Sequence, residues 1–423
     1  MASLAPARAI ERASLLDRYQ PLIGIRATER LLKKARRLSG LELLHINSTR
    51  QGGGVAEILS SLTPLMNDIG IEADWLVIDG SPDFFAVTKD IHNGLQGEPI
   101  RLPPMGRKLH RDIAHANGGQ ARLEDYDVIL VHDPQPLPLV EMRRGQRWVW
   151  CCHIDLSAPD PGVWSYLAPT IERYDAVVFS LPEYAQPLTV PQRFIMPAID
   201  PFSAINRDMS RTESTRHLER YRIPRDLPLV VQAGRFDKWK DPQGVIDAFC
   251  IASQQNPATL VLAGNAADDD PEGPAMYERI CALSGERALV IAADDASLVN
   301  ALQRRAAVVL QKSLREGFGL TVSEAMWKGR AVIGGDVGGI RHQIVDGHSG
   351  CLVSDVQQAA QQIGLLLGDR RMRRNMGRRA RERVRRHFLM TRLLEEWLDL
   401  IAALTARGRA RSSSRELDSL AWR

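Results

Sequence analysis

The sequence contains few cysteines, and their positions argue against both a structural metal site and disulfide bonds. Among 423 residues there are five cysteines, and no two of them have the CxxC spacing typical of such metal sites. Cys151 and Cys152 are adjacent in a strand-like run, so we expect their side chains to point to opposite faces and not to bond each other. An odd number of cysteines without an evident pairing predicts reduced thiols and a cytoplasmic location.

Long apolar runs and a strong excess of one charge are also missing. No apolar stretch reaches the roughly 18 residues that a membrane helix needs, so we expect no membrane span. The first residues mix acids and bases without an apolar core, which is unlike a signal peptide. The formal net charge of +4 is small for this length and predicts no nucleic-acid partner.

Length and composition predict two globular domains. The chain is 44% hydrophobic and 25% charged, and 423 residues exceed what one core usually holds. Strand-like runs alternate with helical patterns in both halves, which predicts an α/β protein with two doubly wound parallel sheets. The predicted domains are 1–198 with an N-terminal helical extension, 199–387, and 388–423 as a helix crossing back to the first domain plus a frayed tail.

The most informative stretch is residues 315–326. It follows an apolar run at 306–310 that reads as a buried strand, and a helix is expected over 320–327. Gly317 and Gly319 carry no Cβ, so the backbone can approach a ligand closely before that helix. The free N–H groups and the positive dipole end of a helix N-terminus suit an anion such as phosphate.

Two acids accompany this helix start. Glu316 lies on the loop, and Glu324 lies eight positions later within the first helical turns. Carboxylates on either side of a phosphate site can accept hydrogen bonds from sugar hydroxyls, so the arrangement predicts a nucleotide-sugar site. The alternative is a solvated loop acid and a helix-surface acid, which the glycines and the preceding strand argue against.

In the first half, polar residues and glycines stand where apolar strands end. Residues 52–54 are three glycines between a predicted strand at 41–46 and a predicted helix at 55–69. His132 and His153 follow two further strand-like runs. Ligands of open parallel sheets bind outside the carboxyl ends of the strands, so one shared crevice is expected. Each feature taken alone has a simpler interpretation. The three glycines can form a tight turn, and a single histidine can be a structural residue.

Three helical segments allow other interpretations. The basic amphipathic pattern at 29–38 is interpreted as a helix packed on the first domain, with a membrane or nucleic-acid role as the alternative. The arginine-rich run at 369–387 lacks interleaved aromatic residues, which favours a solvated helix face over nucleic-acid binding. The pattern at 389–404 predicts an amphipathic helix across the domain junction.

With these residues in view, the sequence resembles the retaining glycosyltransferases of GT-B fold, in glycosyltransferase family four, over roughly residues 28–405. The donor-site pattern of that family is matched by Glu316 and Glu324, by Gly234, Arg235 and Lys240 upstream, and by 338–340 downstream. The segments 47–57, 131–136 and 152–157 are similar to those of the glycosyltransferring trehalose synthases.

The resemblance implies a role for each matched residue. The implied catalytic residues are Arg235, Lys240, Glu316 and His153. Those implied to bind the donor are Glu324, Gly317, Phe318, Gly319, Leu320, Thr321, Gly53 and Gly54. Those implied to bind the acceptor are His132, Asp133 and Gln135.

The implied reaction moves glucose from a nucleoside diphosphate glucose to free glucose and forms α,α-trehalose reversibly, with no metal or other cofactor. The implied partners are small sugars and nucleotide sugars, and a homodimer is left open. A retaining trehalose phosphorylase is one alternative; another is a family-four enzyme with a different sugar or sugar-phosphate acceptor, for which Arg50 is a candidate contact. A non-catalytic sensor and a glycosidase that uses the two acids fit the pattern less well.

Overall fold

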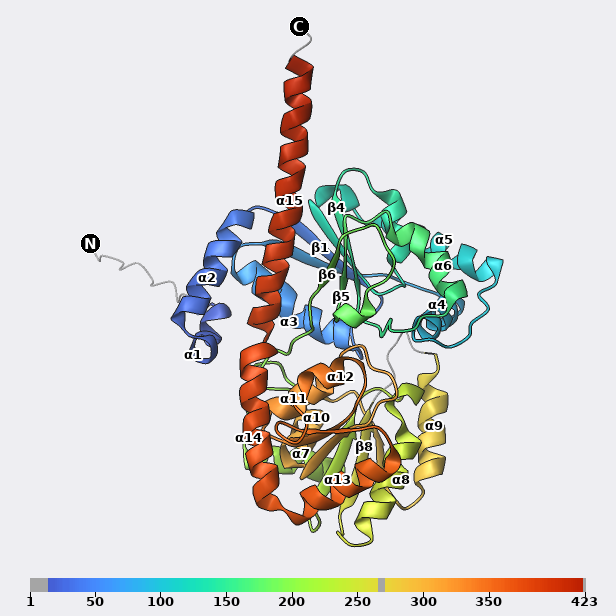
Figure 1. Cartoon of the computed structure of the whole chain (residues 1–423), viewed down its shortest axis with the longest axis vertical. Coiled ribbons are helices and arrows are strands. Elements are labelled where there is room, and N and C mark those ends of the chain that lie inside the picture. Colours follow the sequence, from blue (N-terminus) through green and yellow to red (C-terminus); the bar gives the residue numbers. More distant parts are fainter. Residues whose placement is uncertain (1–13, 265–270, 421–423) are drawn as a thin grey trace, which may run out of the picture.

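The computed structural model describes residues 14–264 and 271–420, with side chains described as far as residue 406. Two Rossmann-like domains lie one above the other, each built on a parallel sheet with helices on both faces (Figure 1). This confirms the predicted fold class. The strand order is β2-β1-β3-β4-β5-β6 in the first sheet and β12-β11-β10-β7-β8-β9 in the second.

All strand pairings within the two sheets are parallel. The first sheet contains β1 (Glu42–Asn47), β2 (Glu72–Val77), β3 (Val128–His132), β4 (Arg147–Cys152), β5 (Ala176–Phe179) and β6 (Gln192–Phe194). The second contains β7 (Leu229–Ala233), β8 (Thr259–Gly264), β9 (Leu289–Ala292), β10 (Val308–Gln311), β11 (Ala331–Gly335) and β12 (Cys351–Val353).

The central strands are mostly apolar because both faces of each sheet are covered. Every residue of β3 is buried, and alternate residues of each strand contribute to the cores on opposite faces. Cys151 and Cys152 follow this alternation, so each packs in a different core. All five cysteines are free thiols, as their spacing predicts.

Most helices lie in the connections between strands, while α1 and α2 precede the first strand and α13 to α15 follow the last one. In the first domain they are α1 (Gln20–Ile23), α2 (Ile25–Ala35), α3 (Gly54–Asp68), α4 (Pro82–Leu95), α5 (Pro104–Gln120) and α6 (Pro161–Ile171). In the second domain they are α7 (Arg211–Arg220), α8 (Pro242–Ser253), α9 (Gly273–Ser284), α10 (Ala296–Arg305), α11 (Leu320–Trp327), α12 (Gly338–Gln343), α13 (Val356–Gly368) and α14 (Arg370–His387). The last helix, α15, spans Met390–Leu420.

Local capping explains a helix that periodicity does not indicate. The charged stretch at 206–226 has poor periodicity, yet it contains α7. Ser210 caps this helix, because its hydroxyl accepts the backbone N–H of Glu213 at 3.0 Å. Serine followed three positions later by glutamate is the capping-box pattern, a local signal that periodicity does not register.

The predicted N-terminal helical extension is described from residue 14 onward, and it is interrupted between α1 and α2. The helical break falls at Gly24, which has a φ of 84°, a conformation that favours glycine. Pro21, by contrast, occupies the first turn of α1, where its missing N–H costs nothing.

The C-terminal helix joins the two domains. It begins beside the domain junction, where Ile199 and Leu389 form a bridge, and runs up the side of the first domain (Figure 1). Its apolar residues pack in the core of the first domain; they are Leu393, Leu394, Trp397, Leu398, Ile401 and Leu404. The prediction of a frayed tail from Ala406 is wrong for the backbone, because α15 continues to Leu420.

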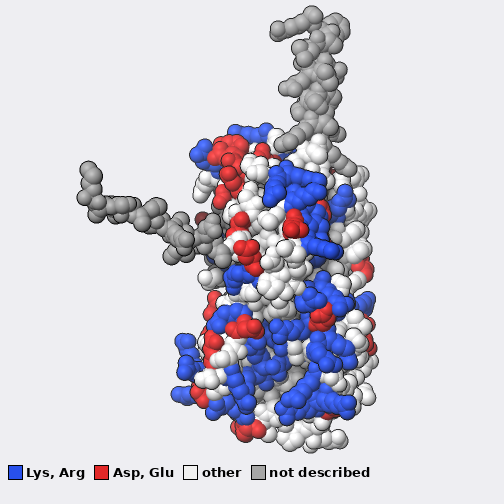
Figure 2. Space-filling view, turned by 90° about the vertical axis from the view of Figure 1, so that its left-hand side faces the viewer, with Lys and Arg blue, Asp and Glu red and all other residues white. Residues whose placement is uncertain are grey.

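The arginine-rich segment forms α14, and Figure 2 shows basic side chains gathered over the domain that carries it. Several of these arginines are not merely solvated. Arg379 donates to the carbonyl oxygen of His348 at 2.6 Å, and Arg383 donates to those of Gln343 and His342 at 2.6 and 2.7 Å. The run therefore ties α14 to neighbouring backbone, a role that its composition alone does not reveal.

Throughout the described residues, every helix is too short or too polar to reach across a lipid bilayer.

Candidate active site

A single cavity of about 570 Å³ lies between the two domains and gathers most of the predicted site residues. Those that line it are Gly53, Gly54, Asp133, His153, Arg235, Lys240, Glu316, Gly317, Phe318, Gly319, Leu320, Thr321 and Glu324. The two predicted cations and the start of α11 thus converge on one hollow. His132 and Gln135 are not part of the lining.

The second domain contributes a charged wall. Gly319 has a φ of 86° and caps α11, whose first residues, Leu320 and Thr321, line the cavity. Beside them Lys240 forms an ion pair with Glu316. The same oxygen of Glu316, Oε2, accepts hydrogen bonds from Gln311 and Ser313, each at 3.1 Å. These bonds hold the Glu316 carboxylate in place at the helix N-terminus.

Glu324 lies deeper on the same wall, within a buried polar network. Its carboxylate accepts a hydrogen bond from Gln303 at 3.2 Å, and burial raises its pKa. The ammonium of Lys328 donates to Gln303 at 2.7 Å and to Asn206 at 2.8 Å. Burial lowers the pKa of Lys328 to about 7. A carboxylate held so firmly inside the protein is pre-organised to accept hydroxyl hydrogen bonds.

Glu57 faces Glu324 from the first domain, and our sequence analysis did not identify it. It lies in the first turn of α3, lines the cavity, and accepts a hydrogen bond from Ser203 at 3.3 Å. Burial, with the nearby charge of Glu324 as the second cause, raises the pKa of Glu57 to about 8. Its place in the first turn after a glycine-rich loop is the signal that could have marked it.

The remaining first-domain wall is mostly backbone and neutral side chains. The loop at 52–54 closes over the start of α11, and a Cβ added to Gly54 would lie 3.3 Å from Cδ1 of Leu320. His153 lines the cavity, and burial lowers its pKa. Arg50 is the one cation that the described part of the first domain adds to the lining, and its guanidinium lies 4.3 Å from the ring centroid of Trp75.

Three histidines form a chain that starts at His153 in this wall and continues through two buried rings behind it. Nδ1 of His45 lies 3.0 Å from Nε2 of His132, and Nδ1 of His132 lies 3.0 Å from Nε2 of His153. His132, which was predicted to bind the acceptor, is 2% exposed and does not line the cavity. It contacts His153, which does. Gln135, the other predicted acceptor residue that does not line the cavity, is also buried.

Asp133 is held in a strained backbone conformation at the end of β3. Its φ of 61° is unusual for a residue other than glycine, and such strain is found preferentially at functional sites. Its carboxylate accepts the backbone N–H of His153 at 2.8 Å, and its carbonyl oxygen accepts the indole N–H of Trp150 at 2.9 Å. Asp133 therefore fixes the loop that carries His153.

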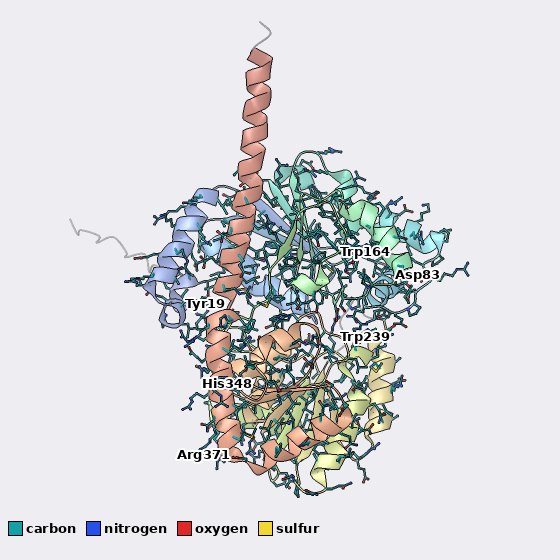
Figure 3. The ribbon with its side chains drawn as sticks, viewed as in Figure 1. Tyr19, Asp83, Trp164, Trp239, His348 and Arg371 are labelled. Carbon is teal, nitrogen blue, oxygen red and sulfur yellow. The ribbon has the colours of Figure 1, made fainter. Side chains whose placement is uncertain are left out.

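Close contacts between the domains surround the cavity. The hydroxyl of Tyr184 donates to the carbonyl oxygens of Glu316 and Gly317, at 3.0 and 3.1 Å. A Cβ on Gly317 would lie 1.8 Å from the carbonyl oxygen of His153, so only glycine allows this approach. Trp239, labelled in Figure 3 at the level where the domains meet, also lines the cavity.

Comparison with known proteins agrees with this geometry. Residues 213–383 match the family described as glycosyl transferases group 1, and residues 45–186 match the N-terminal domain of trehalose synthase. The UDP-forming α,α-trehalose-phosphate synthase of Burkholderia xenovorans, solved with glucose-6-phosphate, is similar in fold, with a TM-score of 0.69 at 14% identity over 86% of this chain and all of that one. Fold and domain matches together define a hexosyltransferase of the GT-B class.

Two relatives narrow the class. The trehalose synthase of Pyrococcus horikoshii is 43% identical over 92% of this chain and 96% of its own length. The trehalose phosphorylase of Pleurotus pulmonarius is 27% identical over 93% of this chain and 61% of its own length. The identity with the Pyrococcus horikoshii enzyme, over almost the full length of both chains, shows that the chain belongs to the trehalose synthase family.

Proposed function

We propose that this enzyme transfers glucose from a nucleoside diphosphate glucose to free glucose, with retention, and forms α,α-trehalose reversibly. The observation that carries the proposal is the convergence of Arg235, Lys240 and the N-terminus of α11 on one cavity that also contains Glu324. Two cations beside a helix N-terminus suit a diphosphate, and a buried acid farther along the wall suits the ribose hydroxyls.

The main chemical problem of this reaction is the charge of the leaving group. Breaking the bond between glucose and the diphosphate leaves negative charge on the phosphate and positive character on the sugar ring. Arg235, Lys240 and the backbone N–H groups that begin α11 would stabilise the phosphate in a site shielded from water. Because these groups supply the positive charge, the proposed reaction needs no metal.

The donor sugar would lie between the two walls. Glu316 and the backbone of residues 317–319 would bind its hydroxyls, and His153 would approach it from the opposite side. In the proposed mechanism the acceptor hydroxyl attacks from the face that the phosphate leaves, and gives its proton to the departing phosphate oxygen. The interdomain contacts of Tyr184 and Gly317 would exclude the water that otherwise hydrolyses the donor.

The first-domain wall favours an uncharged acceptor. Arg50, whose guanidinium is stacked on Trp75, is the one lysine or arginine among the described residues of this wall; its other polar side chains are acidic, as in Asp133 and Glu57, or neutral, as in His153. A sugar phosphate would bring a dianion to a wall that offers little positive charge. Free glucose, with five hydroxyls and no charge, suits this wall better than a sugar phosphate does.

A retaining trehalose phosphorylase is the second candidate, because a relative at 27% identity carries that name. In that reaction inorganic phosphate takes the place of the nucleotide. Glu324 favours the transferase, since an acid placed to bind ribose would have no ligand in a phosphorylase.

The five free thiols support a reducing compartment, such as the cytoplasm, as the location of the protein.

One experiment tests the proposal directly. The purified protein is incubated with glucose and, in turn, with the ADP, UDP and GDP forms of glucose, and the sugars are separated by chromatography. We expect trehalose with at least one donor. If no donor leads to consumption of glucose while trehalose plus inorganic phosphate yields glucose 1-phosphate, the phosphorylase is correct and the transferase is wrong.

A further inference from the structure

A cluster of nitrogen and sulfur ligands extends from His153 in the cavity wall to two buried residues behind it, and the proposed reaction uses only His153. Ring nitrogens of His132 and His153 and the sulfur of Cys151 all lie within 4.8 Å of one another. Nδ1 of His132 is 3.0 Å from Nε2 of His153, and that nitrogen is 3.3 Å from Sγ of Cys151. The three side chains come from the ends of β3 and β4.

The cluster forms because strand periodicity places all its members on one face of the sheet. Cys151 packs in the core between the sheet and α15, and His153 follows two residues later. Leu130 belongs to the same core and precedes His132 by two residues. Since β3 and β4 are neighbours with His132 opposite Cys151, the side chains meet. Cys152 packs in the core on the other face.

The observed separations fit a metal ion. Zinc binds histidine nitrogen at about 2.0–2.1 Å and thiolate sulfur at about 2.3 Å. A tetrahedral ion with these bonds spaces two nitrogens by about 3.3 Å and a nitrogen and sulfur by about 3.5 Å. Two of the three separations, 3.0 and 3.3 Å, are within a few tenths of an ångström of those values, and the third pair lies within 4.8 Å. Small side-chain adjustments would complete the site.

The surroundings supply what a metal site needs beyond its ligands. His45, fully buried, has Nδ1 placed 3.0 Å from Nε2 of His132, so it can accept the N–H that remains when Nδ1 of His132 binds a cation. Asp133 adds a negative charge that attracts a cation; burial, and Asp133 with it, raises the pKa of the Cys151 thiol, so a bound cation has to displace the thiol proton. His153 opens the cluster to the cavity. The fourth coordination position is left for water from the cavity.

We propose that His132, Cys151 and His153 form an inhibitory site for a thiolate- and imidazole-binding divalent cation such as Zn²⁺. The bound cation holds the His153 imidazole against the wall and takes it away from the donor sugar. It is not a cofactor of the reaction. The inhibitory effect rests on the proposed function, whereas binding of the cation does not.

Cobalt(II) is the probe for binding, because a thiolate–cobalt bond gives a charge-transfer absorption. The full-length protein is titrated with Co²⁺ alongside two matched variants, Cys151→Ala and Cys152→Ala, which remove adjacent and equally buried thiols. We expect the wild type and Cys152→Ala to bind one equivalent with the thiolate band. We expect Cys151→Ala to lose the band and to bind at least about 100-fold more weakly, since loss of even an outer partner costs up to that factor.

Absence of the band in the wild type, or equal Co²⁺ affinity in the two variants, overturns the site. Trehalose formation with and without Zn²⁺ tests the effect: inhibition relative to each protein's own metal-free rate is expected in the wild type and Cys152→Ala, and not in Cys151→Ala. Cobalt binding without zinc inhibition overturns the inhibitory role. If no donor yields trehalose, the proposed function fails, and the cobalt titration still decides whether the site exists.

Discussion

The two walls of the interdomain cavity differ in how they present charge. The second-domain wall presents Arg235, Lys240 and Glu316 to the cavity, and an ion pair and two hydrogen bonds fix Lys240 and Glu316 in advance. The first-domain wall presents glycine backbone, His153, whose pKa burial lowers, and Glu57, whose pKa is raised to about 8, with Arg50 as its one lysine or arginine among the described residues. The difference indicates that charge is concentrated where a diphosphate would bind, while the sugars would meet mainly neutral groups.

The largest expected effect tests the charged wall. Replacing Arg235 with alanine should lower kcat about 100- to 1,000-fold, because one fixed donor to a developing phosphate charge is lost. Arg50→Ala, which removes the cation of the other wall, is the matched control and should change kcat less than about 10-fold. Steady-state kinetics give kcat for both variants, and thermal unfolding checks that both are folded. Equal losses in the two variants would remove the contrast between the walls.

The next effect tests whether the walls must touch. Gly317→Ala would place a Cβ 1.8 Å from the carbonyl oxygen of His153 and push the domains apart. We expect kcat to fall about 100-fold, the scale of a 1 Å misplacement at a reacting centre, while nucleotide affinity measured by calorimetry stays close to normal. Gly119→Ala, at a helical position with no neighbour within 4 Å, serves as the control. Full activity of Gly317→Ala would mean that the domains need not approach this closely.

A comparison of acceptors tests the neutral wall without any mutation. We expect kcat/KM for glucose to exceed that for glucose 6-phosphate at least about 10-fold, equivalent to ~1.4 kcal/mol of lost transition-state binding. The reason is that Arg50 alone offers positive charge among the described first-domain lining residues. Competition between the two acceptors, followed by product chromatography, gives the ratio. Preference for the phosphate would assign the enzyme a phosphorylated acceptor.

The smallest expected effect concerns Glu57 and Glu324, the acids that face each other across the walls. Glu57 has a pKa raised to about 8, so it is protonated at neutral pH and ionises above about pH 8, where it repels Glu324 and the nucleotide. Lys328 and Asp200 also act on it. We expect the KM for the donor to rise several-fold between pH 7 and 9 in the wild type but not in Glu57→Gln. Parallel pH profiles of the two proteins would show that Glu57 does not act on the donor site.

Much of the second-domain wall could be predicted because its signals are local in the sequence. The helix expected at 320–327 is observed as α11, and Gly319, Glu316 and Glu324 are placed by the same short stretch. Gly53 and Gly54 likewise reach the cavity because the loop of a parallel strand opens toward it. The edge strands β6 and β12 are harder to predict from the sequence, because each has three residues, too few for a periodic pattern.

The contacts that were not predicted join residues far apart in the chain. Glu57 and Glu324 are 267 positions apart, and their mutual effect exists only once the domains meet. His45 comes from β1 and touches His132 because β3 lies next to β1 in the sheet, not because of any motif. Helix α7 is a separate case, because its Ser210 cap is a local signal in a stretch without clear helical periodicity.

The amino-acid sequence by itself determined the two parallel α/β domains and the donor-side stretch around Glu316, because strand burial, glycine conformations and helix starts depend on neighbours in the chain. Tertiary structure alone decided which side chains face each other: the buried histidine chain, its contact with Cys151, and the acid pair across the cavity. Strand order and domain approach create these contacts, and neither is written in the spacing of residues along one segment.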